Sequence, residues 1–246
     1  MDIVDKSRMV QLLAGSELFC SLSEAELAQL ASHASIRSVP ARSTVFEKGA
    51  CGNEMFAIYQ GKVKISTLST EGKEVIFALL ESGDFFGETA ILDGQPRSAT
   101  CTTIEDSQMV VIERQRFLTY LSTTPGLAIH LLALLCQRLR ATDEQLEDIN
   151  FYSLTVRLAR KLLMLAREYG QELEGRTVIA INLSQLELGS MVWSSRESVN
   201  KQLAQWVKSG LISLHSGMIG IEDHAQLLAI SRLDPGSHTR RFSLLV

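Results

Sequence analysis

The chain has 246 residues, of which 46% are hydrophobic and 21% are charged, a composition typical of a globular protein with one large or two modest domains. No segment has the apolar length of a secretion signal or a membrane span, so we expect a cytoplasmic protein without a membrane partner. The four cysteines are widely spaced, which argues against a thiolate metal site or a disulfide framework and fits a reducing compartment.

Charge is distributed unevenly along the chain. Residues 1–150 carry 13 Lys and Arg against 20 Asp and Glu, and residues 151–246 carry 11 against 8. The net charge of −4 thus divides into −7 for the first part and +3 for the second. A basic module beside an acidic one fits a nucleic-acid-binding domain joined to another domain.

The N-terminal half is predicted to be a roll of strands preceded by a short helix. Ser23 is placed to cap a helix over residues 23–33. Between residues 36 and 112, short apolar runs such as Met55–Tyr59 and Met109–Ile112 are separated by glycine-containing turn signals. Many short strands at nearly regular spacing predict a sandwich or a barrel-like roll.

A long helix is predicted after Pro125. Its seam positions follow one another in alternating steps of four and three residues: Ala128, Leu132, Leu135, Leu139, Thr142, Leu146 and Ile149. This spacing favours a coiled-coil seam between two copies of the chain over a helix packed inside its own chain. Thr142 is polar at a seam position and Asp143 follows it, so either the hydroxyl bonds back to its own helix or a ligand meets the seam.

The C-terminal part is predicted to begin with a hinge at residues 150–153, where Ser153 caps a new helix over 154–168. Gly170 is predicted to close that helix in the left-handed conformation. A strand over 177–181 and two further helices follow. The last residues of the chain are predicted to be a loose tail.

The segment 83–100 combines residues suited to an anion and a sugar. Gly87 allows the backbone to approach a phosphate closely. Arg97 offers a fork of donors for phosphate oxygens, and Ser98 adds a hydroxyl. Glu88 is an acceptor suited to a ribose hydroxyl. Together, between predicted strands, these residues indicate a loop that recognises an anion and a sugar.

This segment resembles the phosphate-binding cassette of the CRP/FNR (catabolite activator) family, whose pattern F-G-E-x-A followed by P-R-S/T-A is present in full. The resemblance implies an α+β fold with an N-terminal double-stranded β-helix (a jelly-roll-like cyclic-nucleotide-binding domain), a long dimerisation helix and a C-terminal winged helix-turn-helix. The implied domains are the roll at 1–124, the dimerisation helix and hinge at 125–152, the DNA-binding domain at 153–232 and a flexible tail at 233–246.

The resemblance also implies the ligand contacts. Glu88 would bind the ribose 2′-hydroxyl, Arg97 the cyclic phosphate, and Thr142 the purine. Asp143 replaces the serine that often follows; a carboxylate only accepts hydrogen bonds, which suits the amino donors of adenine or guanine and leaves the base open. The effector is expected to be cAMP or cGMP, without a metal. The expected ligand-binding set is Gly87, Glu88, Thr89, Arg97, Ser98, Thr142 and Asp143.

A second motif, residues 183–203, predicts a helix-turn-helix. Ser184 caps the first helix and forms a capping box with Glu187, and Gly189 is small where two helices cross. Ser195 caps the second helix. At helical spacing, the inward face of this helix holds Val199, Leu203 and Trp206, and its outward face holds Arg196, Glu197, Asn200 and Lys201.

The second helix resembles the family's S-R-E-T-V recognition helix, with Ser198 in place of the threonine, while Trp193 stands where the family usually has a glycine. We expect Arg196 to read a guanine, Glu197 to accept from a cytosine amino group, and Lys201 to contact a base or a phosphate. The two N-cap serines would hold phosphates. The expected DNA-contacting set is Ser184, Gln185, Ser195, Arg196, Glu197, Ser198 and Lys201, followed by a small wing at 211–213 and 218–221.

These motifs together predict a cyclic-nucleotide-dependent transcription factor and not an enzyme. The expected protein is a homodimer whose ligand binds at the seam between the two long helices. The ligand would reorient the two helix-turn-helix domains so that they bind double-stranded DNA. The resemblance implies palindromic operators with TGTGA-like half-sites and contact with RNA polymerase. The alternatives are the same fold responding to cyclic di-GMP or another effector, and DNA binding without a ligand.

Other classes of function have less support in the sequence. An iron–sulfur sensor would need a cysteine cluster where the chain has only Cys20, and a haem sensor would need His33 or His130 as an axial ligand. No paired nucleophile and base and no Walker loop point to an enzyme. A scaffold that binds protein through its second helix pair is the remaining alternative.

Overall fold

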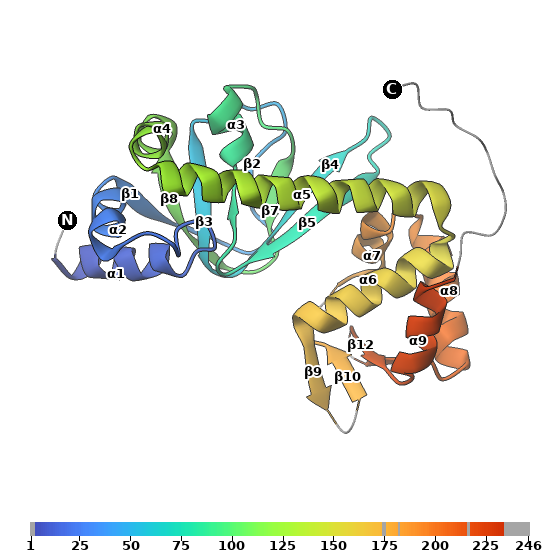
Figure 1. Cartoon of the computed structure of the whole chain (residues 1–246). Helices are drawn as coiled ribbons and strands as arrows, with labels where there is room; N and C mark the ends of the chain where they lie inside the picture. Colours follow the sequence, from blue (N-terminus) through green and yellow to red (C-terminus); the bar gives the residue numbers. More distant parts are fainter. Residues whose placement is uncertain (1–2, 174–175, 182, 216, 234–246) are drawn as a thin grey trace. The chain divides into compact units, whose positions relative to one another are not determined.

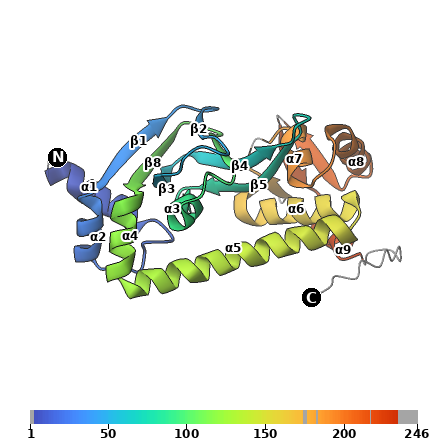
Figure 2. The same ribbon diagram turned by 90° about the horizontal axis from the view of Figure 1, so that it is seen from above.

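The computed structural model describes residues 3–173, 176–181, 183–215 and 217–233 (Figure 1). The chain divides into two compact units, residues 1–139 and 140–246. The division falls within one continuous helix, α5 (Pro125–Phe151), which Figure 2 shows along its length. Each unit is described by itself below.

Two four-stranded antiparallel sheets form the first unit, which confirms the predicted roll (Figure 1). One sheet has the strand order β1-β8-β3-β6 and the other β2-β7-β4-β5. The strands are β1 (Ala34–Val39), β2 (Thr44–Phe46), β3 (Glu54–Gln60), β4 (Lys62–Leu68), β5 (Glu74–Glu81), β6 (Phe85–Phe86), β7 (Thr100–Thr103) and β8 (Ser107–Glu113).

The helices of this unit are α1 (Ile3–Ala14), α2 (Glu24–Ala31), α3 (Glu88–Asp93), α4 (Arg114–Thr123) and the first part of α5. Helix α2 confirms the predicted cap, because Ser23 and Glu26 form a capping box. Helix α1 was not predicted from the sequence. Among the described residues no single helix is long and apolar enough to cross a membrane; α4 and α5 reach that measure only as a pair, which is bent by 112°.

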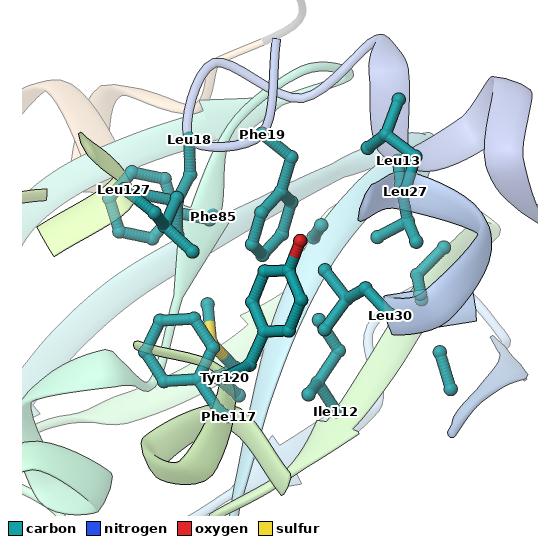
Figure 3. Packing of buried hydrophobic residues seen from close by; sticks show 14 of the residues in the cluster. Leu13, Leu18, Phe19, Leu27, Leu30, Phe85, Ile112, Phe117, Tyr120 and Leu127 are labelled. Carbon is teal, nitrogen blue, oxygen red and sulfur yellow. The ribbon is translucent and has the colours of Figure 1, made fainter. Parts of the chain in front are cut away.

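The main core of the first unit joins the β1-β8-β3-β6 sheet to α1, α2, α4 and α5 (Figure 3). Phe19 and Phe117 meet edge to face with ring centroids 6.3 Å apart. A second cluster lies between the two sheets, where Phe56 and Phe86 stack with centroids 4.9 Å apart. Cys101 of β7 is fully buried in this second cluster. The strands around the predicted effector loop are therefore held by packing on both sides.

Helix α5 carries two apolar faces. Leu127, Leu131 and Leu134 are buried against the core of the first unit. On another face, Leu132 and Leu139 are each 61% exposed and Leu146 is 52% exposed. The exposed leucines are three of the predicted seam positions. The buried leucines fall outside that seam, and their packing explains why one helix has more apolar residues than a coiled coil needs.

The second unit holds α6 (Leu154–Tyr169), a four-stranded sheet and three further helices. The sheet has the order β11-β12-β10-β9, from β9 (Gly170–Leu173), β10 (Arg176–Ile179), β11 (Ile212–His215) and β12 (Met218–Ile221). The helices are α7 (Gln185–Met191), α8 (Arg196–Lys208) and α9 (His224–Ser231). The predicted wing corresponds to β11 and β12. Helix α9 was not predicted, and residues 234–246 of the predicted tail lie outside the described part of the chain.

The prediction for Gly170 is wrong in its conformation. Its φ of −73° and ψ of 135° are extended, and it opens β9 by pairing with Ile179. A Cβ at this position would collide with the carbonyl oxygen of Ala166 in α6. Glycine is needed here because the backbone of β9 passes close to the preceding helix, not because a left-handed turn ends it.

One arginine of α6 joins three elements of the second unit. The Arg160 Nη1 lies 2.5 Å from the Asp148 carboxylate in the last turns of α5, and its guanidinium lies 3.7 Å from the ring centroid of Tyr152. Its Nε donates to the carbonyl oxygen of Ser231 in α9 at 2.9 Å. Ser153, which lies in the chain between Asp148 and Arg160, is the N-cap of α6, as predicted. The end of α5 is thus bonded directly to the helices of the second unit.

Candidate effector and DNA sites

The predicted effector loop begins at a left-handed glycine. Gly87 has a φ of +81° and stands between β6 and α3. A Cβ on Gly87 would lie 2.7 Å from Arg97 Nη1 and 3.2 Å from the carbonyl oxygen of Glu54. Any other residue would therefore strain the backbone and push the arginine away. This is the local reason for the F-G-E pattern in the sequence.

Arg97 is the buried cation of this loop, with 5% of its surface exposed. Its Nη1 donates to the carbonyl oxygen of Gly87 at 2.9 Å, and its Nη2 donates to that of Glu54 at 2.6 Å. The guanidinium lies 4.1 Å from the ring centroid of Phe46. Backbone bonds from Arg97 N–H to Ala50 and from Gly49 to Arg97 hold the loop that delivers it. These contacts hold the side chain from several directions.

The same arginine has an unsatisfied donor. Its Nε is buried and has no hydrogen-bond partner. Burial lowers the pKa of Arg97 by desolvation, partly offset by Glu54. An arginine guanidinium stays charged through such a shift, so the site holds a buried positive charge that an anion would neutralise. Because guanidinium donors match phosphate oxygens, these residues fit a phosphate group.

Glu88 is also buried, with 5% of its surface exposed. Its Oε1 lies 3.0 Å from Arg138 Nη1 of α5 and accepts from the Thr89 hydroxyl at 3.2 Å. Arg138 Nη2 also donates to the carbonyl oxygen of Phe85 at 2.6 Å, and its guanidinium lies 4.2 Å from the Phe85 ring. Sequence reasoning missed Arg138. The available signal was its place one helical turn before Thr142, on the same face of the helix.

The structure brings some of the predicted ligand residues together and separates others. Gly87, Glu88 and Arg97 meet in the first unit. The side chains of Thr89 and Ser98 are exposed beside them. Thr142 and Asp143 are exposed on the part of α5 that belongs to the second unit. The predicted base-binding pair is therefore described separately from the predicted phosphate and ribose residues.

An open cavity of about 820 Å³ adjoins Arg97 between β2, β3 and α4. It shares only Arg97 with the predicted ligand set. Its lining consists of Val45, Phe46, Cys51, Asn53, Glu54, Phe56, Arg97, Glu113, Arg114, Gln115, Leu118 and Thr119.

The second predicted site is a helix-turn-helix formed by α7 and α8. Ser184 and Glu187 form the expected capping box, and Ser195 accepts from the Ser198 N–H at 3.1 Å as the expected N-cap. A Cβ on Gly189 would lie 2.9 Å from the carbonyl oxygen of Ser194, which confirms a close approach at this glycine. The predicted inward residues Val199, Leu203 and Trp206 are buried at 0%, 1% and 5% exposure.

The opposite face of α8 is polar and open to solvent. Arg196, Glu197 and Lys201 are exposed, and Asn200 is half-buried with an unpartnered, buried Oδ1. On α7, Ser184 is exposed and Gln185 half-buried. This face can offer long donors and acceptors at the start of a helix, as a major-groove reader requires.

A strained residue occupies the turn between these helices. Trp193 has a φ of +55° and is 38% exposed. The residue that stands where the family usually has a glycine is thus both partly exposed and in a strained backbone conformation.

A β-roll that is followed by a helix-turn-helix domain defines a class of DNA-binding regulators. The family model of the cyclic nucleotide-binding domain matches residues 36–124, and that of the Crp-like helix-turn-helix domain matches residues 156–230. The chain belongs to the CRP/FNR family of transcription regulators, and this family consists of regulators rather than enzymes.

Relatives from several bacteria support this assignment. The chain is 32% identical over 224 residues to the "CRP-like cAMP-activated global transcriptional regulator" of Mycobacterium tuberculosis, covering 91% of this chain and 100% of the relative. It is 30% identical over 219 residues to the "Cyclic AMP receptor protein" of Thermus thermophilus, covering 89% and 98%. Among solved structures, the c-di-GMP responsive global regulator CLP of Xanthomonas campestris matches with a TM-score of 0.73 and 22% identity, over 82% of this chain and 100% of that one.

Proposed function

We propose that this regulator is switched by a cyclic mononucleotide, cAMP or cGMP, bound beside Arg97. The single observation that carries the proposal is the buried guanidinium of Arg97, whose Nη atoms are held by two backbone carbonyls while its Nε has no partner. A cyclic phosphate supplies both the missing acceptor and a compensating negative charge. The cAMP-linked names of the two relatives above favour the same class of effector.

Each remaining ligand residue has a proposed role that follows from its chemistry. Gly87 and Ser98 contact the phosphate, and Thr89 lies beside them. Glu88, held by Arg138, accepts from the ribose 2′-hydroxyl. Thr142 and Asp143 meet the base. The Asp143 carboxylate can accept from the N6 amino group of adenine or from N1–H and the N2 amino group of guanine.

We further propose that the chain acts as a homodimer joined along α5. The exposed leucines at positions 132, 139 and 146 form an apolar stripe on a helix whose other apolar face is already buried. A second copy of the same stripe would cover it. The effector would then favour the arrangement of the two readers that fits DNA, because it binds that state more tightly.

The proposed target is a palindromic operator with TGTGA-like half-sites about one helical turn apart. Arg196 reads a guanine, Glu197 accepts from a cytosine, and Lys201 contacts a base or a phosphate. The remaining contacts, to the DNA backbone, come from Ser184, Gln185, Ser195 and Ser198. Contact with RNA polymerase follows from family membership alone.

The effector is tested by calorimetric titration of the purified protein with cAMP, cGMP and cyclic di-GMP. The variant is Arg97→Gln, and the matched control is Arg116→Gln, which removes the same charge from an exposed position on α4. Thermal unfolding of each variant establishes that it is folded. We expect one mononucleotide to bind to the wild type and the control, and its affinity to fall at least about 100-fold in Arg97→Gln, as expected for a lost charge-assisted contact.

The other outcomes contradict the proposal in separate ways. Tight binding of cyclic di-GMP alone would mean that the effector is this dinucleotide and not a cyclic mononucleotide. The 22% identity to the Xanthomonas regulator concerns the fold and does not argue for that ligand. Binding that survives in Arg97→Gln would remove the phosphate role of Arg97. Absence of binding by all three nucleotides would leave a regulator with another effector or with none.

A further inference from the structure

A carboxylate of this chain stands close to the cation of the proposed effector site. The backbone carbonyl of Glu54 accepts from Arg97 Nη2 at 2.6 Å, and both residues line the same open cavity. Burial lowers the pKa of Arg97, and the negative charge of Glu54 is the largest of the effects that oppose this shift, ahead of that of Glu88. Among the described residues, Glu54 is thus the anion best placed to compete with a phosphate for Arg97.

A second arginine holds the Glu54 carboxylate. Arg37 Nη2 lies 2.9 Å from Glu54 Oε1, and β8 lies between the two strands that carry these residues, so the ion pair crosses one strand of the sheet. The Arg37 guanidinium also lies 5.4 Å from the ring centroid of Phe56. Phe56 follows Glu54 by two positions on β3, so both side chains leave the same face of the sheet. The ring therefore lies beside the arginine that pairs with the carboxylate.

Arg97 lies near the same aromatic ring but keeps an unused donor. Its guanidinium is 5.8 Å from the Phe56 centroid. The Glu54 carboxylate is bonded to Arg37, whereas Arg97 Nε has no hydrogen-bond partner. A carboxylate oxygen that is held by one guanidinium is less available to another, because its lone pairs and its charge are already engaged. The ion pair with Arg37 thus leaves a donor of Arg97 available.

We propose that Arg37 is a positioning residue, which keeps the Glu54 carboxylate away from Arg97 and so leaves the Arg97 donor open to the effector phosphate. Without Arg37, the carboxylate would turn to the guanidinium of Arg97, because a charge-assisted hydrogen bond is stronger than one between neutral groups. The effector would then have to displace this carboxylate before it could bind. The inference rests on the phosphate role of Arg97 proposed above.

The first test needs no effector. A double-mutant cycle of Glu54→Gln and Arg97→Gln measures how strongly the two side chains interact, from the unfolding equilibrium constants in chemical denaturation. The cycle is carried out in the wild type and again in Arg37→Gln. We expect the coupling between the two side chains to strengthen by a factor of about ten when Arg37 is absent. Equal coupling in both backgrounds would overturn the inference.

The second test measures the affinities for cAMP and cGMP by calorimetry. The variants are Arg37→Gln, Arg37→Lys, Glu54→Gln and the double variant Arg37→Gln with Glu54→Gln. The matched control is Lys64→Gln, which removes a cation from another ion pair of the roll, where Lys64 Nζ lies 2.9 Å from Glu74 on the second sheet. Thermal unfolding of each variant establishes that it is folded.

For a nucleotide that binds the wild type, we expect Arg37→Gln to weaken binding about tenfold, and Arg37→Lys and the control to change it little. The double variant should recover the affinity, so Glu54→Gln should improve binding mainly where Arg37 is absent. An equal improvement in the wild type would show that only net charge matters and that the positioning role is wrong. Absence of binding by both nucleotides in the wild type would contradict the proposed effector, and the first test would still decide the role of Arg37.

Discussion

At the scale of single residues, the predicted effector site depends on two arginines with different surroundings. Arg97 is held by two backbone carbonyls and lies over the Phe46 and Phe56 rings. Arg138 instead neutralises Glu88, which is 93% buried as a side chain. Removal of Arg138 would leave the buried Glu88 carboxylate without its cation. Removal of Arg97 would leave the backbone carbonyls of Gly87 and Glu54 without this donor, and these groups carry no net charge.

We therefore expect Arg138→Ala to lower the free energy of unfolding by about 1–3 kcal/mol, the usual penalty for a buried group that loses its partner. Chemical denaturation measures this change. The double variant Arg138→Ala with Glu88→Gln should recover part of the loss, because the remaining side chain is then uncharged. Equal stability of Arg138→Ala and the wild type would show that water replaces the arginine.

The buried thiol of Cys101 gives a prediction about pH. Burial raises the pKa of Cys101 from the usual 9.0 to about 12, so the folded protein keeps the thiol proton over a range in which the unfolded chain loses it. Stability from this group is complete below pH 9.0 and falls as the pH rises toward 12, by at most about 1.4 kcal/mol per pH unit.

The measurement is the free energy of unfolding of the wild type and of Cys101→Ala across the alkaline range. We expect a shallower decline in the variant, while other titrating groups affect both proteins alike. Parallel curves would contradict the prediction. The same burial protects Cys101 from thiol reagents in the folded state, in contrast to the exposed Cys20, Cys51 and Cys136.

Residue-scale features differ in how far the sequence predicts them. The caps at Ser184 and Ser195 were predictable because each bond spans three residues. The partners of the two arginines were not, because Arg138 and Glu88 are 50 residues apart and Arg97 and Glu54 are 43 apart. The sequence motif identifies Arg97, whereas the place of Arg138 beside Glu88 depends on how the chain folds.

At the scale of elements, α5 has one apolar face that is covered by the first unit and one that is exposed. Leu131 is 2% exposed and Leu139 is 61% exposed, eight residues apart on the same helix. The sequence pattern identified the outer stripe through its regular spacing. It did not separate the inner leucines, because periodicity reports that a face is apolar and not which partner covers it.

This difference predicts opposite consequences for two substitutions in α5. Leu139→Glu should leave the protomer folded by circular dichroism and abolish the dimer, because a charge would enter the seam. Leu131→Ala should leave a cavity and destabilise the protein by about 2–5 kcal/mol without specific loss of dimer contacts. Sedimentation and chemical denaturation measure the two effects. A dimer that persists in Leu139→Glu would place the interface elsewhere.

The sequence reasoning missed helix α9 and the backbone conformation at the end of α6. Helix α9 has buried Leu227 but no strong periodic pattern, and it is held by contacts such as Arg160 to Ser231. Gly170 was misassigned because a glycine after a helix usually marks a left-handed end. Here tertiary contact with α6 determines its conformation.

At the scale of the whole molecule, the proposed switching requires that a change in α5 reaches the DNA-binding helices. Arg160 provides a physical connection inside the second unit, since it bonds to Asp148 of α5 and to Ser231 of α9 and stacks on Tyr152. These contacts surround the segment predicted as a hinge. These contacts would make the end of α5 and the helix-turn-helix move together.

We expect Arg160→Ala to keep the effector affinity of the wild type, because its partners Asp148, Tyr152 and Ser231 include none of the proposed ligand residues. The ratio of DNA affinities with and without effector should fall by about tenfold, equivalent to about 1.4 kcal/mol of coupling. Calorimetry and DNA-binding titrations measure the two quantities, with Lys208→Ala, an exposed charge at the end of α8, as the control. An unchanged ratio would show that the coupling follows another route.

The fixed position of Arg97 has a consequence for the timing of the response. A side chain that is held by the carbonyls of Gly87 and Glu54 loses little rotational freedom when it binds an anion. Capture of the messenger should then be governed by diffusion, and differences in affinity among variants should appear in the lifetime of the complex. A regulator built in this way can follow a falling messenger concentration as quickly as the bound molecule departs.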